Sequence, residues 1–214
     1  MSSFRWSLIL GGGDGCRCAG AGEEQAAHHK QAKSDGENHL VSFILRSRSC
    51  TGSSATRASR RGWRILDRRY SLNYHHTAYR VELPMRAHCR DLYSHLVDTM
   101  VWADQLVWKR LARNETVYPQ AEYIVYDARD GEPGTIEPHV DNNSAVSMIV
   151  LLSDPSEFSG GTNYFDGDGA CPGSRPLDLQ RGDAVLFRGE KLMHWISSVT
   201  GGVRVILQIE LCRV

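Results

Sequence analysis

Three side chains suited to metal binding stand out in the C-terminal half of this 214-residue sequence. His139 and Asp141 are separated by one residue, so on an extended chain both side chains leave the same face. His194 follows in a later segment, which we expect to fold back beside the first two residues. Two imidazoles and one carboxylate on one side of an ion leave its other side open, an arrangement typical of non-haem Fe(II).

A fourth candidate, Arg204, lies ten positions beyond His194. It sits inside the apolar segment 203–209, which predicts a buried strand. A guanidinium in such a strand is costly to bury without an anion, and arginine favours a bidentate carboxylate. A dicarboxylic acid that chelates the metal by one end would place its far carboxylate there, and 2-oxoglutarate has this chemistry.

Each of these residues also has an ordinary structural interpretation. The first two could belong to an exposed turn, and His194, between apolar neighbours, could be a core histidine. Arg204 could pair with Glu210 or Asp183. The spacing of all four residues together favours a metal centre with an adjacent anion site.

The segments around these residues resemble the 2-oxoglutarate/Fe(II) dioxygenase superfamily, in its prolyl 4-hydroxylase and lysyl hydroxylase branch. The resemblance covers roughly residues 120–214 and rests on the order and spacing of separate pieces, which is more specific than a lone His-x-Asp. The pieces are Pro138-His139-Val140-Asp141, Ile149-Val150-Leu151-Leu152-Ser153-Asp154, Gly160-Gly161-Thr162-Asn163-Tyr164-Phe165, Gly182-Asp183-Ala184-Val185-Leu186-Phe187, and His194 with Val199-Thr200-x-Gly202 and Arg204.

The resemblance implies a role for each candidate. The two histidines and the aspartate bind Fe(II), and Arg204 holds the far carboxylate of 2-oxoglutarate. Tyr126, on the strand before the metal loop, is similar to the family tyrosine whose hydroxyl helps to bind 2-oxoglutarate, and Tyr123 is the alternative. A hydroxyl of Ser147 or Thr200 either adds a contact or is structural.

The sequence departs from the prolyl hydroxylase pattern at one position. That branch often has a tyrosine three residues before the first metal histidine, where this sequence has Ile136. In this respect the chain is closer to the lysyl hydroxylase branch, and the carboxylate contact falls mainly on Arg204.

The resemblance implies an enzyme that uses Fe(II), 2-oxoglutarate and O₂, with ascorbate, to hydroxylate a C–H bond. It favours a peptidyl proline or lysine, with a free amino acid or small metabolite as the next candidate. Nucleic-acid demethylation is disfavoured, because that branch usually carries a second arginine six residues past the first, where this sequence has Glu210. The alternative from another class is a metal-binding jelly roll that acts as a sensor or binding module without turnover.

The segments that must position these residues are mostly of β type. Many short strands with Gly, Pro and Asp turns predict a sandwich or barrel, and the resemblance implies a double-stranded β-helix, a jelly roll, with flanking helices. Strands are expected at 123–126, 144–152, 177–179, 184–187 and 203–211, with a loop at 127–135 and a turn region at 154–161.

A helix is expected before these strands. Segment 79–83 alternates and predicts a strand that ends at Pro84. From about Arg86 to Ala112, apolar residues recur at three- and four-residue spacing, which predicts a helix that covers the outer face of the sheet, assisted by Trp102 and Trp108. Its apolar stripe comprises Leu92, Leu96, Met100 and Leu106, with Val97, Val101 and Val107 beside them.

Residues 1–70 differ in composition from the rest and predict a disordered Gly/Ser/Arg-rich extension before a dioxygenase domain at 71–214. Between 46 and 69 there are eight arginines and one acid, Asp67, a composition also typical of organelle-targeting segments. Acidic residues further upstream argue against targeting, so a cytoplasmic location is favoured. No run reaches the ~18 apolar residues of a membrane span.

The remaining features favour an ordinary intracellular protein. The formal net charge is zero, so no global field attracts nucleic acid or an anionic membrane. The six cysteines form no paired framework, which predicts free thiols in a reducing compartment. The pairs His28-His29 and His75-His76 have no carboxylate at ligand spacing, and we expect both in solvated loops.

Overall fold

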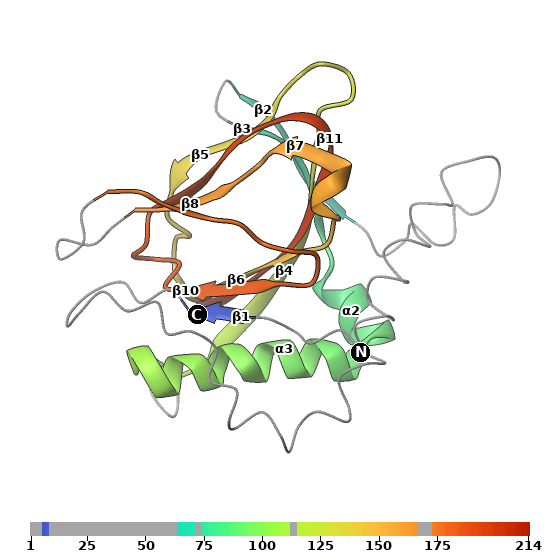
Figure 1. The fold of residues 1–214 in the computed structure, drawn as a ribbon. Coiled ribbons are helices and arrows are strands. Elements are labelled where there is room, and N and C mark those ends of the chain that lie inside the picture. Colours follow the sequence, from blue (N-terminus) through green and yellow to red (C-terminus); the bar gives the residue numbers. More distant parts are fainter. Residues whose placement is uncertain (1–5, 9–63, 72–73, 112–114, 167–172) are drawn as a thin grey trace.

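The computed structural model describes residues 6–8, 64–71, 74–111, 115–166 and 173–214. Its strands form a hydrogen-bonded network that folds into two facing layers, and a helix covers the outer side of one layer (Figure 1). The strands are β1 Trp6–Leu8, β2 Arg64–Ser71, β3 Tyr74–Arg80, β4 Val117–Asp127, β5 Gly134–His139, β6 Ser144–Leu151, β7 Phe158–Gly160, β8 Asn163–Phe165, β9 Arg175–Leu177, β10 Ala184–Phe187 and β11 His194–Arg213. The helices are α2 Glu82–His88 and α3 Arg90–Ala103, followed by the π-helical turn η2 Asp104–Trp108 and later by the 3₁₀ turn η3 Pro155–Glu157.

Strand β11 belongs to both layers. Its C-terminal half lies between β4 and β6, in a layer with the order β1-β10-β6-β11-β4-β3-β2. Its N-terminal half pairs with β5, β7 and β8, which lie across from that layer (Figure 1). Gly202, with φ +73°, lies where β11 passes from one layer to the other. A Cβ at this position would lie 2.0 Å from the carbonyl oxygen of Glu157. This two-layered arrangement is the predicted jelly roll with flanking helices.

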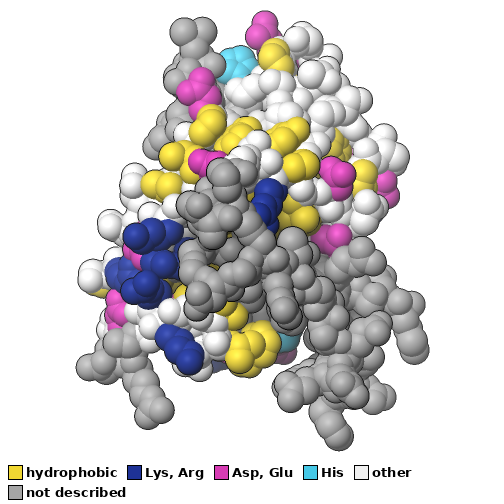
Figure 2. Space-filling model, turned by 60° about the vertical axis from the view of Figure 1, so that its left-hand side comes forward, with side chains coloured by type: hydrophobic (Ala, Val, Ile, Leu, Met, Phe, Trp, Pro, Cys, Tyr) yellow, Lys and Arg dark blue, Asp and Glu magenta, His cyan; other side chains and the backbone are white. Residues whose placement is uncertain are grey.

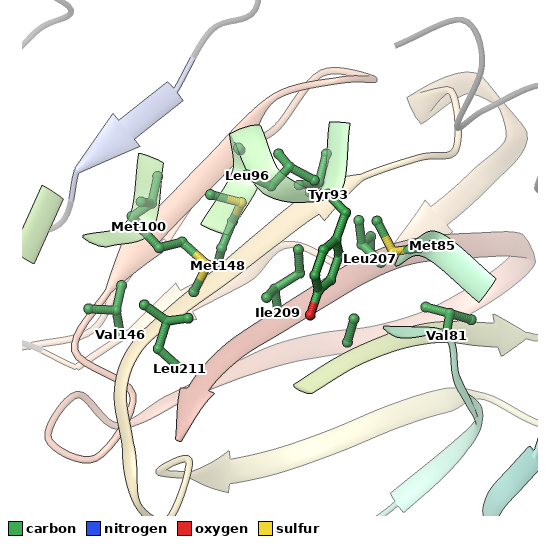
Figure 3. Packing of buried hydrophobic residues seen from close by; sticks show 14 of the residues in the cluster. Val81, Met85, Tyr93, Leu96, Met100, Val146, Met148, Leu207, Ile209 and Leu211 are labelled. Atoms are coloured by element: carbon green, nitrogen blue, oxygen red, sulfur yellow. The ribbon is translucent and has the colours of Figure 1, made fainter. Parts of the chain in front are cut away.

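The alternation of side chains along β11 creates two cores. Val205, Leu207, Ile209 and Leu211 pack toward the helices, whereas Ile206 packs between the two layers. Figure 3 shows the first core, where Tyr93, Leu96 and Met100 of α3 point toward Met148 of β6 and toward β11. Burying each large apolar side chain contributes about 1.5–3 kcal/mol, so this contact fixes which face of β11 is turned inward.

The predicted helix is divided and begins earlier than expected. Strand β3 ends at Arg80, and α2 begins at Glu82, because Pro84 is compatible with the first turn of a helix. Cys89, with φ −137° and ψ 44°, separates α2 from α3. The stripe is confirmed at Leu96 and Met100, which are buried, whereas Leu106 is 58% exposed and Trp102 46% exposed.

The exposure of Leu106 follows from η2. A π-helical turn contains one extra residue, which rotates the following side chains away from the positions that a 3.6-residue repeat predicts. Asp104 is fully buried there, and its carboxylate accepts hydrogen bonds from the backbone N–H groups of Arg110 and Leu111. The continuous helix expected to 112 therefore ends here, as an α-helix at Ala103 and as a π turn at Trp108.

The strands expected at 123–126, 144–152, 184–187 and 203–211 are confirmed in place, and the first and last of them are longer than predicted. β4 begins at Val117, and β11 begins at His194. In the segment expected as a strand at 177–179, β9 ends at Leu177. The expected loop at 127–135 is interrupted by β5 from Gly134.

The histidine pair His75-His76 is a further correction. Both residues lie in β3 and are partly buried, so they do not form the expected solvated loop. The His76 ring lies 5.3 Å from that of Tyr126, because the two residues are on neighbouring strands. The other pair, His28-His29, is outside the described residues.

The predicted boundary at residue 70 remains a prediction. Most of 1–70 is outside the described residues, although β1 and all of β2 except Ser71 fall within that range. Of the cysteines, Cys89 and Cys212 are free and buried, and the other four are also outside the described part.

The described surface mixes charges of both signs. On the face seen in Figure 2, dark-blue Lys and Arg side chains gather at the lower left with magenta acidic side chains beside them, and hydrophobic side chains spread over the upper half. None of the helices in the described ranges has the length and apolar character needed to cross a membrane.

Candidate metal centre and anion site

The pairing of β5 with β11 brings two of the candidate ligands together. His139 and His194 are direct partners in this antiparallel pair, and their ring centroids are 4.3 Å apart. Asp141 Oδ1 is 3.6 Å from the Nε2 atom of each histidine. One donor atom from each of the three residues lies within 4.8 Å of the other two. The structure therefore assembles the three side chains that the sequence singles out.

Backbone carbonyls orient both imidazoles. His139 Nδ1 lies 2.7 Å from the carbonyl oxygen of Glu137, and His194 Nδ1 lies 3.0 Å from that of Leu192. A carbonyl can only accept, so Nδ1 carries the proton and the lone pair of Nε2 is directed to the shared centre. Burial lowers the pKa of His194, which keeps this imidazole in the neutral form that a metal requires.

Asp141 lies just beyond β5, and hydrogen bonds hold both its backbone and its side chain. Its backbone N–H donates to the carbonyl of Gly189, and its Oδ2 accepts a 2.5 Å hydrogen bond from the hydroxyl of Ser147. The chain turns immediately afterwards at Asn143, whose φ of +64° is one that asparagine tolerates well. Ser147 therefore positions Asp141 while leaving Oδ1 directed at the histidines.

Arg204 is the largest of the fully buried side chains, at 1% exposure. Its Nη2 donates to Asn163 Oδ1 at 2.9 Å, whereas its Nε and Nη1 are buried without a hydrogen-bond partner. Neither Glu210 nor Asp183 forms an ion pair with it in the described structure, so the alternative pairing is wrong. Burial also lowers the pKa of Arg204, a sign that its charge lacks a compensating anion.

Tyr126 and Tyr123 lie on opposite faces of β4. Tyr126 is opposite Arg204 in the β4–β11 pairing, and the guanidinium carbon is 5.3 Å from its ring centre, which is within cation–π range. Tyr123 instead packs in the core beneath the helices. Burial raises the pKa of Tyr126 to about 12, so its hydroxyl stays protonated and able to donate. Of the two tyrosines, only Tyr126 is on the side of the candidate site.

One pocket joins the two candidate metal-binding histidines to the surroundings of Arg204. Tyr126 and Asn163, the two side chains that contact Arg204, line it together with His139 and His194. Ile136, the residue that stands where the prolyl hydroxylase pattern has a tyrosine, also lines this pocket.

The sequence does not reveal the roles of two residues that support the site. Asn163 lies in one of the segments that resemble the dioxygenase superfamily. Its contact with Arg204 joins residues 41 positions apart, so no local sequence pattern predicts it. The sequence suggests Ser147 as a contact for 2-oxoglutarate, whereas its hydroxyl donates to Asp141. Thr200, the other hydroxyl considered, is exposed.

The residues fit the metal and the anion that the sequence implies. The donor set is two neutral imidazole nitrogens and one carboxylate oxygen, which suits Fe(II). The buried, unpaired Nε and Nη1 of Arg204 suit a carboxylate, since an uncompensated buried guanidinium is otherwise costly.

Comparison with known proteins shows what the fold is similar to. No model of a protein family matches the sequence, and no curated protein matches it. Among solved structures, a prolyl-4-hydroxylase from Pseudomonas putida is similar with a TM-score of 0.58 and 15% identity, over 83% of this chain and 86% of that one. A prolyl hydroxylase from Trichoplax adhaerens, solved with a hypoxia inducible factor peptide fragment, is similar with a TM-score of 0.56 and 12% identity, over 84% of this chain and 79% of that one. These likenesses confirm the jelly-roll fold.

Proposed function

We propose that this chain is an Fe(II)- and 2-oxoglutarate-dependent dioxygenase that hydroxylates a C–H bond. The observation that carries this proposal is the combination, around one pocket, of a His-Asp-His ligand set and a buried arginine with two unpaired nitrogens. A jelly roll that only held a metal would need no buried guanidinium beside it.

Each residue has a task that follows from its contacts. His139, Asp141 and His194 would hold the iron, with Ser147 orienting the carboxylate. Arg204 would bind the far carboxylate of 2-oxoglutarate through Nε and Nη1, while Asn163 and Tyr126 keep the guanidinium in place. The hydroxyl of Tyr126, which stays protonated, is a further donor for that carboxylate.

The overall reaction converts 2-oxoglutarate, O₂ and the substrate C–H group into succinate, CO₂ and the substrate alcohol. When bound, Fe(II) supplies the redox chemistry that couples oxidative decarboxylation to this hydroxylation. The protein positions the reactants and excludes water, because the ligands and Arg204 lie in an interior lined by buried apolar side chains.

A peptidyl proline or lysine is the substrate class that we favour. Two findings support it, namely the family-like pieces of the sequence and the structural likeness to prolyl hydroxylases, one of which was solved with a peptide fragment. Ascorbate belongs to the proposal as an additive that keeps such a centre active.

The decisive experiment measures succinate release from 2-oxoglutarate by the purified protein with Fe(II) and ascorbate. His194→Ala removes one ligand, and His88→Ala, which changes an exposed histidine of α2, is the matched control. Release by the wild type and the control but not by His194→Ala is the expected result. Failure of the wild type to bind Fe(II) would overturn the proposal, and stoichiometric Fe(II) without any release would favour a sensor or binding module.

A further inference from the structure

The barrel-facing side of β11 continues beyond the residues already assigned. Arg204, Ile206, Gln208 and Glu210 follow one another at every second position and therefore point to the same face of the strand. Ile206 and Gln208 line the pocket, which confirms that this face is the inner one. Six residues of extended chain place Arg204 and Glu210 about 20 Å apart. A small dicarboxylate held by Arg204 does not extend to Glu210.

Ser147 connects Glu210 to the metal ligand Asp141. It is the register partner of Ser147 on β6, and Ser147 donates to Asp141. On its other side, Glu210 is opposite Gln120 of β4. A group bound to Glu210 would thus lie beside Gln208, which lines the pocket, and near Asp141, at the end of this face away from Arg204.

The contacts of Glu210 within the protein are with neutral groups. Its Oε1 accepts a 2.8 Å hydrogen bond from the amide of Gln208, and its Oε2 accepts from the thiol of Cys212 at 3.7 Å. Burial raises the pKa of Glu210 to about 7, and the negative charges of Asp141 and Glu122 act in the same direction. Within the described part of the chain, no cationic side chain forms an ion pair with it.

The arginine on β3, the next strand beyond β4, is engaged elsewhere. Arg80 of β3 is 3.5 Å from a carboxylate oxygen of Glu122 and 3.8 Å from one of Glu82, and it donates to Gln120. Among the described residues named here, three are carboxylates, Glu82, Glu122 and Glu210, and one is a cation, Arg80. A ligand that brings its own positive charge would relieve the cost of the partly buried Glu210 carboxylate.

We propose that Glu210, positioned by Gln208, is the specificity-determining residue of this site and binds a substrate ammonium group, as in a lysine side chain. This inference rests on the proposed function and narrows its substrate from a peptidyl proline or lysine to a basic residue. The methylene stem of a lysine suits the apolar wall formed by Ile149 and Ile206, because such stems pack on apolar surface while the charge stays with a polar partner.

The test measures binding, so that it does not depend on turnover. The full-length protein is loaded with Fe(II) and 2-oxoglutarate under anaerobic conditions and titrated, by NMR or calorimetry, with N-acetyl-lysine methylamide. N-acetyl-norleucine methylamide has nearly the same shape without the ammonium, and N-acetyl-proline methylamide represents the other substrate. We expect the lysine compound to bind at least tenfold more tightly than both.

Two variants assign the effect to one carboxylate. Glu210→Gln should remove the preference for lysine over norleucine, whereas Glu132→Gln, which removes the same charge from an exposed loop, should keep it. A thermal shift of Glu210→Gln on addition of 2-oxoglutarate establishes that this variant is folded.

Each outcome bears on the inference. Equal binding of the lysine and norleucine compounds, or an unchanged preference in Glu210→Gln, would overturn it even if the protein releases succinate. Tighter binding of free lysine than of the methylamide would support ammonium recognition and identify a free amino acid as its source. Absence of succinate release together with a Glu210-dependent lysine preference would instead count against the proposed reaction alone.

Discussion

The hydroxyl of Ser147 donates a 2.5 Å hydrogen bond to the carboxylate of Asp141. This bond connects β6 to the loop that carries the metal ligand. Ser147 is itself 2.9 Å from the hydroxyl of Ser144, whose Oγ donates to the carbonyl of Val146. The orientation of Asp141 is thus set by buried groups of the neighbouring strand. This relation makes Ser147 part of the metal site without being a ligand.

Ser147→Ala should therefore weaken metal binding while the fold persists. Groups that orient a metal ligand typically contribute 10–100-fold to affinity, and we expect the Fe(II) dissociation constant to rise by about this factor. Anaerobic titration of Fe(II) measures it, and Ser198→Ala, at an exposed position of β11, is the control. An unchanged dissociation constant would mean that the backbone contact of Asp141 with Gly189 is sufficient to orient the carboxylate.

Arg204→Met should abolish the stabilisation of the protein by 2-oxoglutarate, while the ligand-free protein should lose little stability. The guanidinium has two unpaired buried nitrogens, and replacement of a buried charge by an apolar side chain of similar length is often neutral. We expect the free energy of unfolding of the ligand-free protein to change by about 1 kcal/mol or less. In the wild type, 2-oxoglutarate at one hundred times its dissociation constant should add about 2.7 kcal/mol.

Thermal unfolding with and without 2-oxoglutarate measures both quantities. Arg181→Met, which changes an exposed arginine, should retain the full ligand-induced rise in Tm. A rise in Tm that persists in Arg204→Met would show that the far carboxylate binds elsewhere.

Gly161→Ala should disturb Arg204 from the opposite layer. A Cβ at position 161 would lie 2.6 Å from Arg204 Cδ, and the backbone there has φ +70°. Gly182 has φ +87° and nothing within 4 Å of its would-be Cβ, so Gly182→Ala introduces the same kind of backbone strain without the clash. We expect both variants to lose about 1–3 kcal/mol of stability from the backbone alone.

The two glycine variants should differ in ligand binding. Only Gly161→Ala should weaken 2-oxoglutarate binding, as measured by calorimetry, because only its Cβ displaces the guanidinium. Equal affinities in the two variants would contradict the role given to Arg204.

Glu210→Gln should change stability in a pH-dependent manner. Burial raises the pKa of Glu210 in the folded protein to about 7 from an ordinary value of 4.5, so the fold favours the protonated form. The Glu210 carboxyl therefore lowers the free energy of unfolding as pH rises from 4.5 to about 7. Below pH 4.5 the carboxyl is protonated in both the folded and the unfolded protein, so this effect is absent. The free energy of unfolding of the variant should exceed that of the wild type by roughly 1–3 kcal/mol at about pH 8. Near pH 4 the two proteins should be equally stable.

Denaturant unfolding of the metal-free protein at both pH values measures this difference. Absence of metal matters because the charge of Asp141 contributes to the raised pKa. A stability difference that is independent of pH would mean that Glu210 is not protonated on folding.

Patterns local in the sequence determined much of the fold. The apolar segment 203–209 predicted the strand that carries Arg204, and the one-residue spacing of His139 and Asp141 predicted that they act together. The stripe of α3 correctly predicted that Leu96 and Met100 face the sheet. These predictions hold because strand and helix periods are properties of the backbone, whatever the chain packs against.

Tertiary packing decided the rest. Tyr123 and Tyr126 are three residues apart, which places them on opposite faces of β4, but only the helix packed beneath one face determines which of them meets Arg204. Asn163, Ser147 and Glu210 acquire their roles from cross-strand neighbours. The type and spacing of the four key residues were thus determined by the sequence itself. Their supporting partners were determined by strand register, because contacts between distant segments leave no periodic trace along the chain.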